Sequence, residues 1–190
     1  IQRLIEMAID GFSCTIFCYG QTGSGKTHTL TGPPKLFQNN VDMVSEDHGI
    51  IFRSFLHLFQ QIEKRKDELF VLKASYIEIY NEKVIDLLNP GKNLNVRWSK
   101  KKRGFYVENQ FSVECAELDD LVAVLEEGMR NRRVRGHNMN ENSGRSHTIL
   151  TISIYGEQKQ SEDNVYISRE GTLNFVDLAG SERTKDTMCE

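Results

Sequence analysis

The sequence has too few cysteines for a protein held together by many disulfides or by structural zinc. Its four cysteines, Cys14, Cys18, Cys115 and Cys189, show neither zinc-ligand spacing nor a dense disulfide pattern. Cys14 and Cys18 fall in one apolar run that predicts a strand, where residues four apart lie about 13 Å from each other. That separation is too long for a disulfide. We therefore expect reduced thiols in the core of a cytosolic protein.

The chain also lacks long apolar runs and a strong charge of one sign. It has no stretch of about 18 apolar residues, so we expect no insertion into a membrane. The formal net charge is −3, and without an overall basic field no nucleic-acid binding is expected. An acidic partner would have to be met by a local basic patch. Hydrophobic residues make up 38% of the 190 residues, which is ordinary for one globular domain.

The apolar pattern predicts strands that alternate with helices, as in α/β folds with a largely buried sheet. We expect helices over residues 1–9, 25–31, 49–66 and 118–129 and strands over 15–19, 70–80, 148–156 and 171–177, with short strands within 94–113. The strand at 15–19 is expected to be central and buried. Because the chain starts inside a helical pattern and stops directly after a functional motif, we expect a piece of a larger protein.

A complete phosphate-binding motif follows the first predicted strand. Residues 20–27, Gly-Gln-Thr-Gly-Ser-Gly-Lys-Thr, match G-x-x-x-x-G-K-[ST] at every position. The glycines let backbone N–H groups approach a triphosphate, and the following helix points its positive end at the same oxygens. Lys26 is expected to reach the outer phosphate oxygens and Thr27 to place its hydroxyl on Mg²⁺. The strand before the motif argues against a plain glycine-rich turn.

Two other polar segments suit the remaining needs of ATP hydrolysis, which are a second hold on Mg²⁺ and a group that positions water. Residues 173–177 form an apolar strand that ends in Asp177, which is expected to hold Mg²⁺ through water. Gly180 follows where its backbone N–H could sense a γ-phosphate. Residues 140–147 form a polar loop between a predicted helix and a predicted strand. Each segment alone could be an ordinary turn or a solvated loop. Their occurrence together with the phosphate-binding motif favours a role in nucleotide hydrolysis.

These segments resemble the P-loop, switch I and switch II of kinesin motor domains, in the family's order and at its spacing. The resemblance rests on residues 20–29, 140–147 and 177–182, together with 75–88, and it extends through nearly the whole chain. It implies a kinesin-like P-loop NTPase fold, which is a three-layer α/β arrangement with a central sheet flanked by helices, here incomplete at both ends. Residues 1–190 are then a partial motor domain, without the N-terminal strand, the C-terminal microtubule-binding helices and the neck linker.

The resemblance implies ATP and Mg²⁺ as cofactors and assigns the residues that bind them. MgATP binding is implied for the P-loop and the residue after it, that is Gly20, Gln21, Thr22, Gly23, Ser24, Gly25, Lys26, Thr27 and His28. Thr27 and Asp177 are implied at Mg²⁺, the latter through water.

The catalytic roles implied by the resemblance fall on the switches. Asn140 and Ser143 would contact the γ-phosphate region, and Gly180 would report its presence. Arg145 and Glu182 would form a salt bridge that closes the switches and helps to order the attacking water. No strong base is needed, because positioning and charge stabilisation do most of the work in phosphoryl transfer.

The chain departs from the kinesin pattern at two positions. Kinesins usually have two consecutive serines in switch I, and this chain has Ser143-Gly144. The second serine usually gives a hydroxyl to Mg²⁺, a place that water could take. We expect slower switch closure, and Gly144→Ser is expected to raise microtubule-stimulated turnover. Phe52 stands where kinesins usually have proline, and we expect a change in how its helix begins.

Basic residues suggest where a partner binds. The run Lys100, Lys101, Lys102 and Arg103 resembles a kinesin loop that contacts microtubules, and tubulin surfaces are acidic. A solvated turn is the plain alternative. The arginines of residues 130–135 either couple track contact to switch I or cap the C-terminus of their helix, and the cap is favoured. Dimerisation through a coiled coil outside the chain and a cytoplasmic, cytoskeletal location are family-level expectations.

The leading hypothesis is an ATP-hydrolysing microtubule motor domain. The alternative is a kinesin-fold microtubule-associated or regulatory module with weak or no ATPase activity, which Gly144 alone favours. A generic P-loop kinase or nucleic-acid ATPase would need a lid, an acceptor site or a basic groove, and the sequence shows none.

Overall fold

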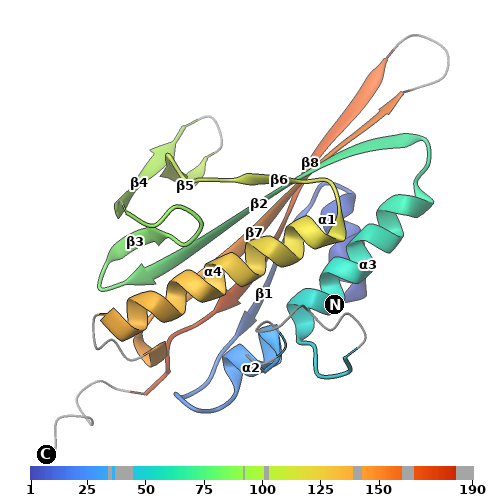
Figure 1. The fold of residues 1–190 in the computed structure, drawn as a ribbon. Coiled ribbons are helices and arrows are strands. Elements are labelled where there is room, and N and C mark those ends of the chain that lie inside the picture. The colour runs from blue at the N-terminus through green and yellow to red at the C-terminus, as the bar shows by residue number, and fades with distance from the viewer. Residues whose placement is uncertain are drawn as a thin grey trace, which may run out of the picture.

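The computed structural model describes residues 1–33, 36, 45–91, 93–100, 103–138, 143–159 and 165–182. The helices are α1 Gln2–Ile9, α2 Lys26–Thr31, α3 Ile50–Lys64 and α4 Leu118–Asn138, with a short 3₁₀ helix η2 at Ser143–Arg145. The strands are β1 Ser13–Cys18, β2 Glu68–Tyr80, β3 Lys83–Asp86, β4 Asn93–Ser99, β5 Gly104–Glu108, β6 Val113–Cys115, β7 His147–Lys159 and β8 Tyr166–Asp177. Figure 1 shows the helices lying along a twisted sheet.

β1 and β8 terminate at the same end of the sheet, and this positions the functional site. The strand order within the described chain is β1-β8-β7-β2-β3-β4-β5, with β6 paired to β2. β1 and β8 run parallel, and their register places Cys18 opposite Asp177. β7 runs antiparallel to β8, with Thr148 opposite Asp177. The chain that leaves β1, the acid that ends β8 and the start of β7 therefore meet at one end of the sheet.

Helices α1, α3 and α4 pack on one face of this sheet and form the core with it. The period of two along a strand explains which residues face them: along β7, Leu150, Ile152 and Ile154 are buried. From α3, Phe55 meets Phe175 of β8 edge to face, with ring centroids 6.4 Å apart. The apolar faces predicted for the helices are therefore the faces that pack on the sheet. None of the described helices is both long and apolar enough to cross a membrane.

Within the described residues, the strand expected at 15–19 is neither central nor buried on both faces. Among the described strands β1 lies at the end of the sheet and pairs with β8 alone. Alternation turns Cys14 toward the helices, while Phe17, on the opposite face, is 61% exposed. An apolar run cannot reveal which of its sides is covered, because periodicity carries no information about distant helices.

The other predicted elements are found close to their expected places. The helices at 1–9, 25–31 and 49–66 and the long strand at 70–80 are confirmed. α4 continues to Asn138, well beyond the predicted end at 129. α3 begins at Ile50, and Phe52 lies buried with its ring stacked on His48 at 3.8 Å. Cys14, Cys18 and Cys115 are free thiols, as expected.

Candidate nucleotide-binding site

The P-loop is the turn between β1 and α2. Lys26 begins α2, and the residue before it, Gly25, has φ +89°. Side chains with a Cβ rarely adopt that left-handed backbone, so the turn requires glycine there. The local sequence thus builds a loop whose backbone curls in front of a helix start, as the motif predicts.

A cavity of about 240 Å³ lies over this loop. Its walls combine three segments that are far apart in the chain, namely the P-loop with His28, switch I and switch II: Thr22, Gly23, Gly25, Lys26, Thr27, His28, Gly144, Asp177 and Leu178. The structure therefore brings six of the predicted nucleotide-binding residues, all except Gly20, Gln21 and Ser24, and the acid that ends β8 to one shared cavity.

Thr27 and Asp177, the two residues implied at Mg²⁺, are in direct contact. The Thr27 hydroxyl donates to Oδ2 of Asp177 over 2.6 Å. The other carboxylate oxygen, Oδ1, is buried and has no hydrogen-bond partner among the described residues. A buried acceptor left open beside a hydroxyl at the phosphate loop fits a hydrated Mg²⁺, which prefers oxygen ligands and keeps several waters. The residues present therefore suit the metal that the family implies.

Lys26 is held inside its own loop. Its ammonium Nζ donates to the carbonyl oxygens of Gly20, over 2.9 Å, and Gln21, over 2.8 Å. These neutral acceptors hold the side chain across the turn. Phosphate oxygens carry full charge and bind an ammonium more strongly than carbonyls do.

Switch II, residues 177–182, is attached to three different elements through consecutive backbone N–H groups. Ala179 donates to Nδ1 of His147 over 3.0 Å. Gly180 donates to the carbonyl of Gly144 in switch I over 2.7 Å, and Ser181 donates to the carbonyl of Gly20 in the P-loop over 3.1 Å. The three acceptors therefore lie at the start of β7, in η2 and in the P-loop, and the first two both belong to switch I.

Glu182 contacts the P-loop rather than Arg145. One carboxylate oxygen accepts from the backbone N–H of Thr22 over 2.9 Å, and the other accepts from the Thr22 hydroxyl. The Thr22 hydroxyl bond is the main reason why the pKa of Glu182 is below its ordinary value. The expected Arg145–Glu182 salt bridge is not formed within the described part of the chain, because Thr22 offers two donors to the carboxylate at close range. Both carboxylate oxygens of Glu182 are therefore occupied by the P-loop.

Behind Asp177 lies a buried ionic cluster that sequence reasoning missed. Arg132 of α4 donates to Oδ2 of Asp177 over 2.9 Å and lies 3.9 Å from Glu78 of β2. Arg135 contacts Glu78 over 3.3 Å. The favoured interpretation of this run as a helix cap did not include these contacts, in which Arg132 and Arg135 reach from α4 to acids on the sheet. Glu78 was the available signal, since it shares the face of β2 that carries the buried Leu72, Ala74 and Tyr76.

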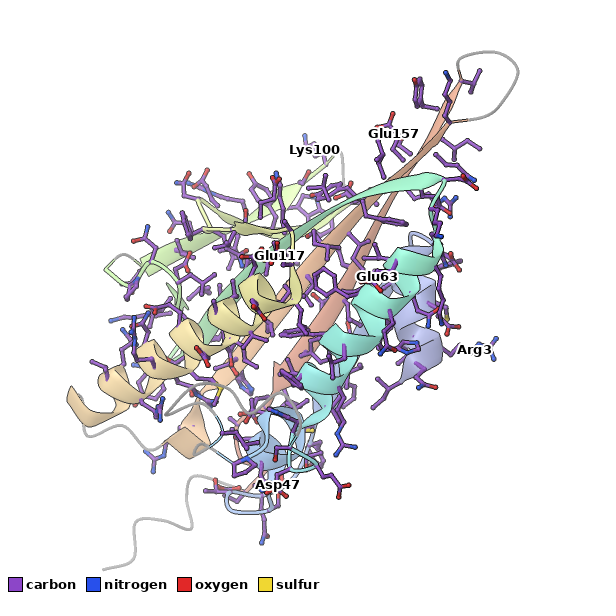
Figure 2. The ribbon with its side chains drawn as sticks, turned by 45° about the vertical axis from the view of Figure 1, so that its right-hand side comes forward. Arg3, Asp47, Glu63, Lys100, Glu117 and Glu157 are labelled. Carbon is purple, nitrogen blue, oxygen red and sulfur yellow. The ribbon has the colours of Figure 1, made fainter. Side chains whose placement is uncertain are left out.

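The remaining predicted site residues are placed as follows. Ser143, Gly144 and Arg145 form η2, directly before β7. Asn140 lies outside the described residues, as do Lys101 and Lys102. The β4–β5 hairpin carries Lys100 and Arg103 at its turn, and Figure 2 shows Lys100 at the opposite end of the molecule from Asp47, which lies near α2. Lys100 and the nucleotide cavity beside α2 are therefore far apart.

A strand–loop–helix phosphate cradle beside a parallel strand that ends in an acid defines a P-loop nucleotide-binding domain. The family model of the kinesin motor domain matches residues 1–190. The chain belongs to the kinesin motor domain family.

Individual relatives agree with this assignment. Kinesin-like protein KIF12 of Mus musculus is 45% identical, over 98% of this chain and 29% of its own length. Kinesin-like protein KIF15 of Homo sapiens is 40% identical, over 100% of this chain and 14% of its own length. A solved structure described as "Structure of a fast kinesin: Implications for ATPase mechanism and interactions with microtubules" superposes with a TM-score of 0.87 at 31% identity, covering 100% of this chain and 51% of that one. The kinesin-type P-loop fold expected from the sequence is confirmed, and the chain spans less than a third of these two relatives.

Proposed function

We propose that this chain is the part of a microtubule motor domain that binds and hydrolyses MgATP and passes the state of the nucleotide to its switches. The observation that carries the proposal is the contact of the P-loop with both switches around one cavity that also contains Asp177. The proposal covers residues from the P-loop through switch II. The helices that bind microtubules, the neck linker and a dimerising coiled coil are assigned to other parts of the protein.

Each of the chain's own groups has a defined task in this proposal. The P-loop N–H groups hold the phosphates, and Lys26 exchanges its two carbonyl acceptors for phosphate oxygens. Mg²⁺, when bound, neutralises developing charge on the phosphates. Thr27 and Asp177 hold its ligand shell, and Arg132 fixes the orientation of Asp177. Precise placement of these groups is the main source of rate in phosphoryl transfer.

The switches supply the sensor. The Gly180 N–H points at Gly144 and is the donor that we assign to sensing the γ-phosphate. When the Gly180 N–H exchanges the Gly144 carbonyl for a phosphate oxygen, switch I and switch II lose the bond between them. Switch II stays attached to the P-loop through Ser181 and Glu182. We assign Asn140, Ser143 and Arg145 to the same γ-phosphate side, and Arg145 to pairing with Glu182 when Thr22 is released.

Contact with tubulin is assigned to the β4–β5 hairpin. Lys100 and Arg103, with Lys101 and Lys102 between them, place positive charge on a turn that extends from the sheet (Figure 2). The hairpin is stiffened by Trp98 and Phe105, whose rings meet at 4.9 Å. A basic sequence between two paired strands is suited to an acidic filament surface. This assignment places the protein on the microtubule cytoskeleton.

A second candidate, a kinesin-fold microtubule-binding module with little ATPase activity, is favoured by one observation. A Cβ placed on Gly144 would lie 2.5 Å from the Thr22 hydroxyl oxygen, so switch I approaches the P-loop closely only because residue 144 is glycine. The missing serine hydroxyl and this close approach both favour slow turnover.

Steady-state phosphate release by the full-length protein, with and without microtubules, tests the proposal. Strong stimulation that disappears in Lys26→Ala supports the motor assignment. Microtubule binding without turnover supports the second candidate. Absence of MgATP binding in the wild-type protein would contradict both the nucleotide site and its mechanism.

A further inference from the structure

His147 belongs to the polar run of switch I, yet none of the tasks above uses it. It is the first residue of β7 and lies opposite Ile79 of β2. Its Nδ1 accepts the Ala179 N–H over 3.0 Å. A backbone N–H can only donate, so Nδ1 carries no proton and the ring must have its proton on Nε2. The contact thus specifies one tautomer of the ring.

The three acceptors that hold switch II differ in their surroundings. The acceptors of Gly180 and Ser181 are carbonyls of switch I and the P-loop, which are the loops that face the nucleotide cavity. His147 is instead part of β7, which pairs with β2 on one side and β8 on the other over almost its full length. A strand held on both sides moves less than a loop. Of these three bonds, the Ala179 bond is therefore the one that attaches switch II, beyond the end of β8, to the rigid sheet.

This attachment precedes the sensing residue directly. Fixing the N–H of Ala179 fixes the peptide plane between Leu178 and Ala179. Only φ and ψ of Ala179 then separate this plane from the one that carries the Gly180 N–H, which limits the directions in which that N–H can point. The other donors of the segment can change partners when the loops move, but Ala179 keeps its acceptor as long as the ring presents Nδ1.

We propose that His147 is a positioning residue which, through Nδ1, holds Ala179 on β7 and thereby aims the Gly180 N–H at the γ-phosphate. The inference rests on the proposed function, because it assigns how the switch II sensor is oriented. It concerns the terminal phosphate only, since the ring binds switch II through Ala179.

Two substitutions of similar size separate the hydrogen bond from the bulk of the ring. His147→Asn places a carbonyl oxygen where Nδ1 stands, because both atoms follow Cγ directly. His147→Gln carries its amide one bond further, near the position of Nε2, and leaves Ala179 without an acceptor. The matched control is His57→Gln on α3, where the ring contacts Glu6 of α1 instead of a switch.

In the full-length protein we expect His147→Gln to lower microtubule-stimulated kcat about three- to tenfold, the effect of one ordinary hydrogen bond. ADP affinity should stay at the wild-type value, while affinity for a non-hydrolysable ATP analogue falls. His147→Asn should restore the rate and the analogue affinity, and His57→Gln should leave all of them unchanged. Hydrogen exchange of residues 178–182 should quicken in His147→Gln and match the wild type in His147→Asn.

Equal losses in the Asn and Gln variants, or no loss in either, would overturn the proposal. Faster exchange of residues 178–182 in His147→Asn would overturn it even if the Gln variant failed to fold. Hydrogen exchange also separates this inference from the proposed function. A wild-type protein that neither binds nor hydrolyses ATP contradicts the proposed function, whereas the exchange pattern alone decides whether His147 holds Ala179.

Discussion

Arg132 of α4 donates a hydrogen bond to Oδ2 of Asp177 at the end of β8 over 2.9 Å, although 45 residues separate them in sequence. The same carboxylate oxygen accepts from Thr27 of the P-loop. Because α4 leads directly into switch I, this contact joins the helix before one switch to the first residue of the other. The Arg132–Asp177 pair is largely buried, so we expect the loss of either charge to lower the stability of the protein.

Removing the arginine should destabilise the protein. Arg132→Met leaves Asp177 and Glu78, which are 6% and 5% exposed, without their shared counter-ion. Breaking a buried pair from one side costs about 3–5 kcal/mol. Urea unfolding should show a loss of this order. Arg130→Met is the control, because its ion pair with Glu127 lies at the exposed surface of the same helix.

A double-mutant cycle with Asp177→Asn sharpens this prediction. We expect the double variant to be more stable than the sum of the single losses implies, because neither charge is then left alone. Additive losses would show that the two side chains contribute independently and that the contact is not a stabilising pair.

Gly144 allows a prediction in which a methyl group and a hydroxyl have different effects. Both Gly144→Ala and Gly144→Ser add a Cβ that would lie 2.5 Å from the Thr22 hydroxyl, so both should weaken the docking of switch I on the P-loop. Only serine adds an oxygen able to join the ligand shell of Mg²⁺. We expect Gly144→Ser to raise microtubule-stimulated turnover about three- to tenfold and Gly144→Ala not to raise it.

Steady-state ATPase rates of the three proteins check this expectation. If serine lowers turnover as much as alanine does, the close contact with Thr22, and not the missing hydroxyl, limits the rate. That result would contradict the explanation of slow switch closure derived from the sequence.

The basic hairpin should contribute to microtubule affinity through charge. Lys100→Ala combined with Arg103→Ala is expected to weaken binding several-fold at low salt, with a smaller difference at high salt because ions screen exposed charges. Co-sedimentation with microtubules over a salt series measures both. Lys64→Ala, an exposed lysine at the end of α3, is the control. Equal effects of the control and the hairpin variant would point to general charge attraction instead of a hairpin contact.

Cys115 predicts a loss of stability at alkaline pH. Burial raises the pKa of this thiol from its ordinary value of 9.0 to about 11. Between these values the unfolded chain loses the proton while the folded chain keeps it, so stability falls as the pH rises from about 9 to about 11. The fall is at most about 1.4 kcal/mol per pH unit. Unfolding free energies over this range should be less pH-dependent in Cys115→Ala, and an unchanged slope would refute the assignment.

The sequence by itself determined the local parts of this protein. The P-loop at residues 20–27 depends only on the backbone conformation of one turn. Glycine is needed at position 25 because the backbone there is left-handed, directly before Lys26. Amphipathic helices such as α3 and the alternation along β7 follow from periods that neighbouring residues express. With the kinesin resemblance, these segments were enough to predict the fold class and most of the residues that line the cavity, but not Leu178.

Only the tertiary structure decided which distant groups meet. Glu182 contacts Thr22 across 160 positions of sequence, and Arg132 pairs with Asp177 where a helix cap had been expected. The apolar run at 15–19 became the end of the sheet for the same reason. Side-chain partners and strand order depend on how whole elements pack, and the free energy of that packing is not expressed in the local pattern of any one segment.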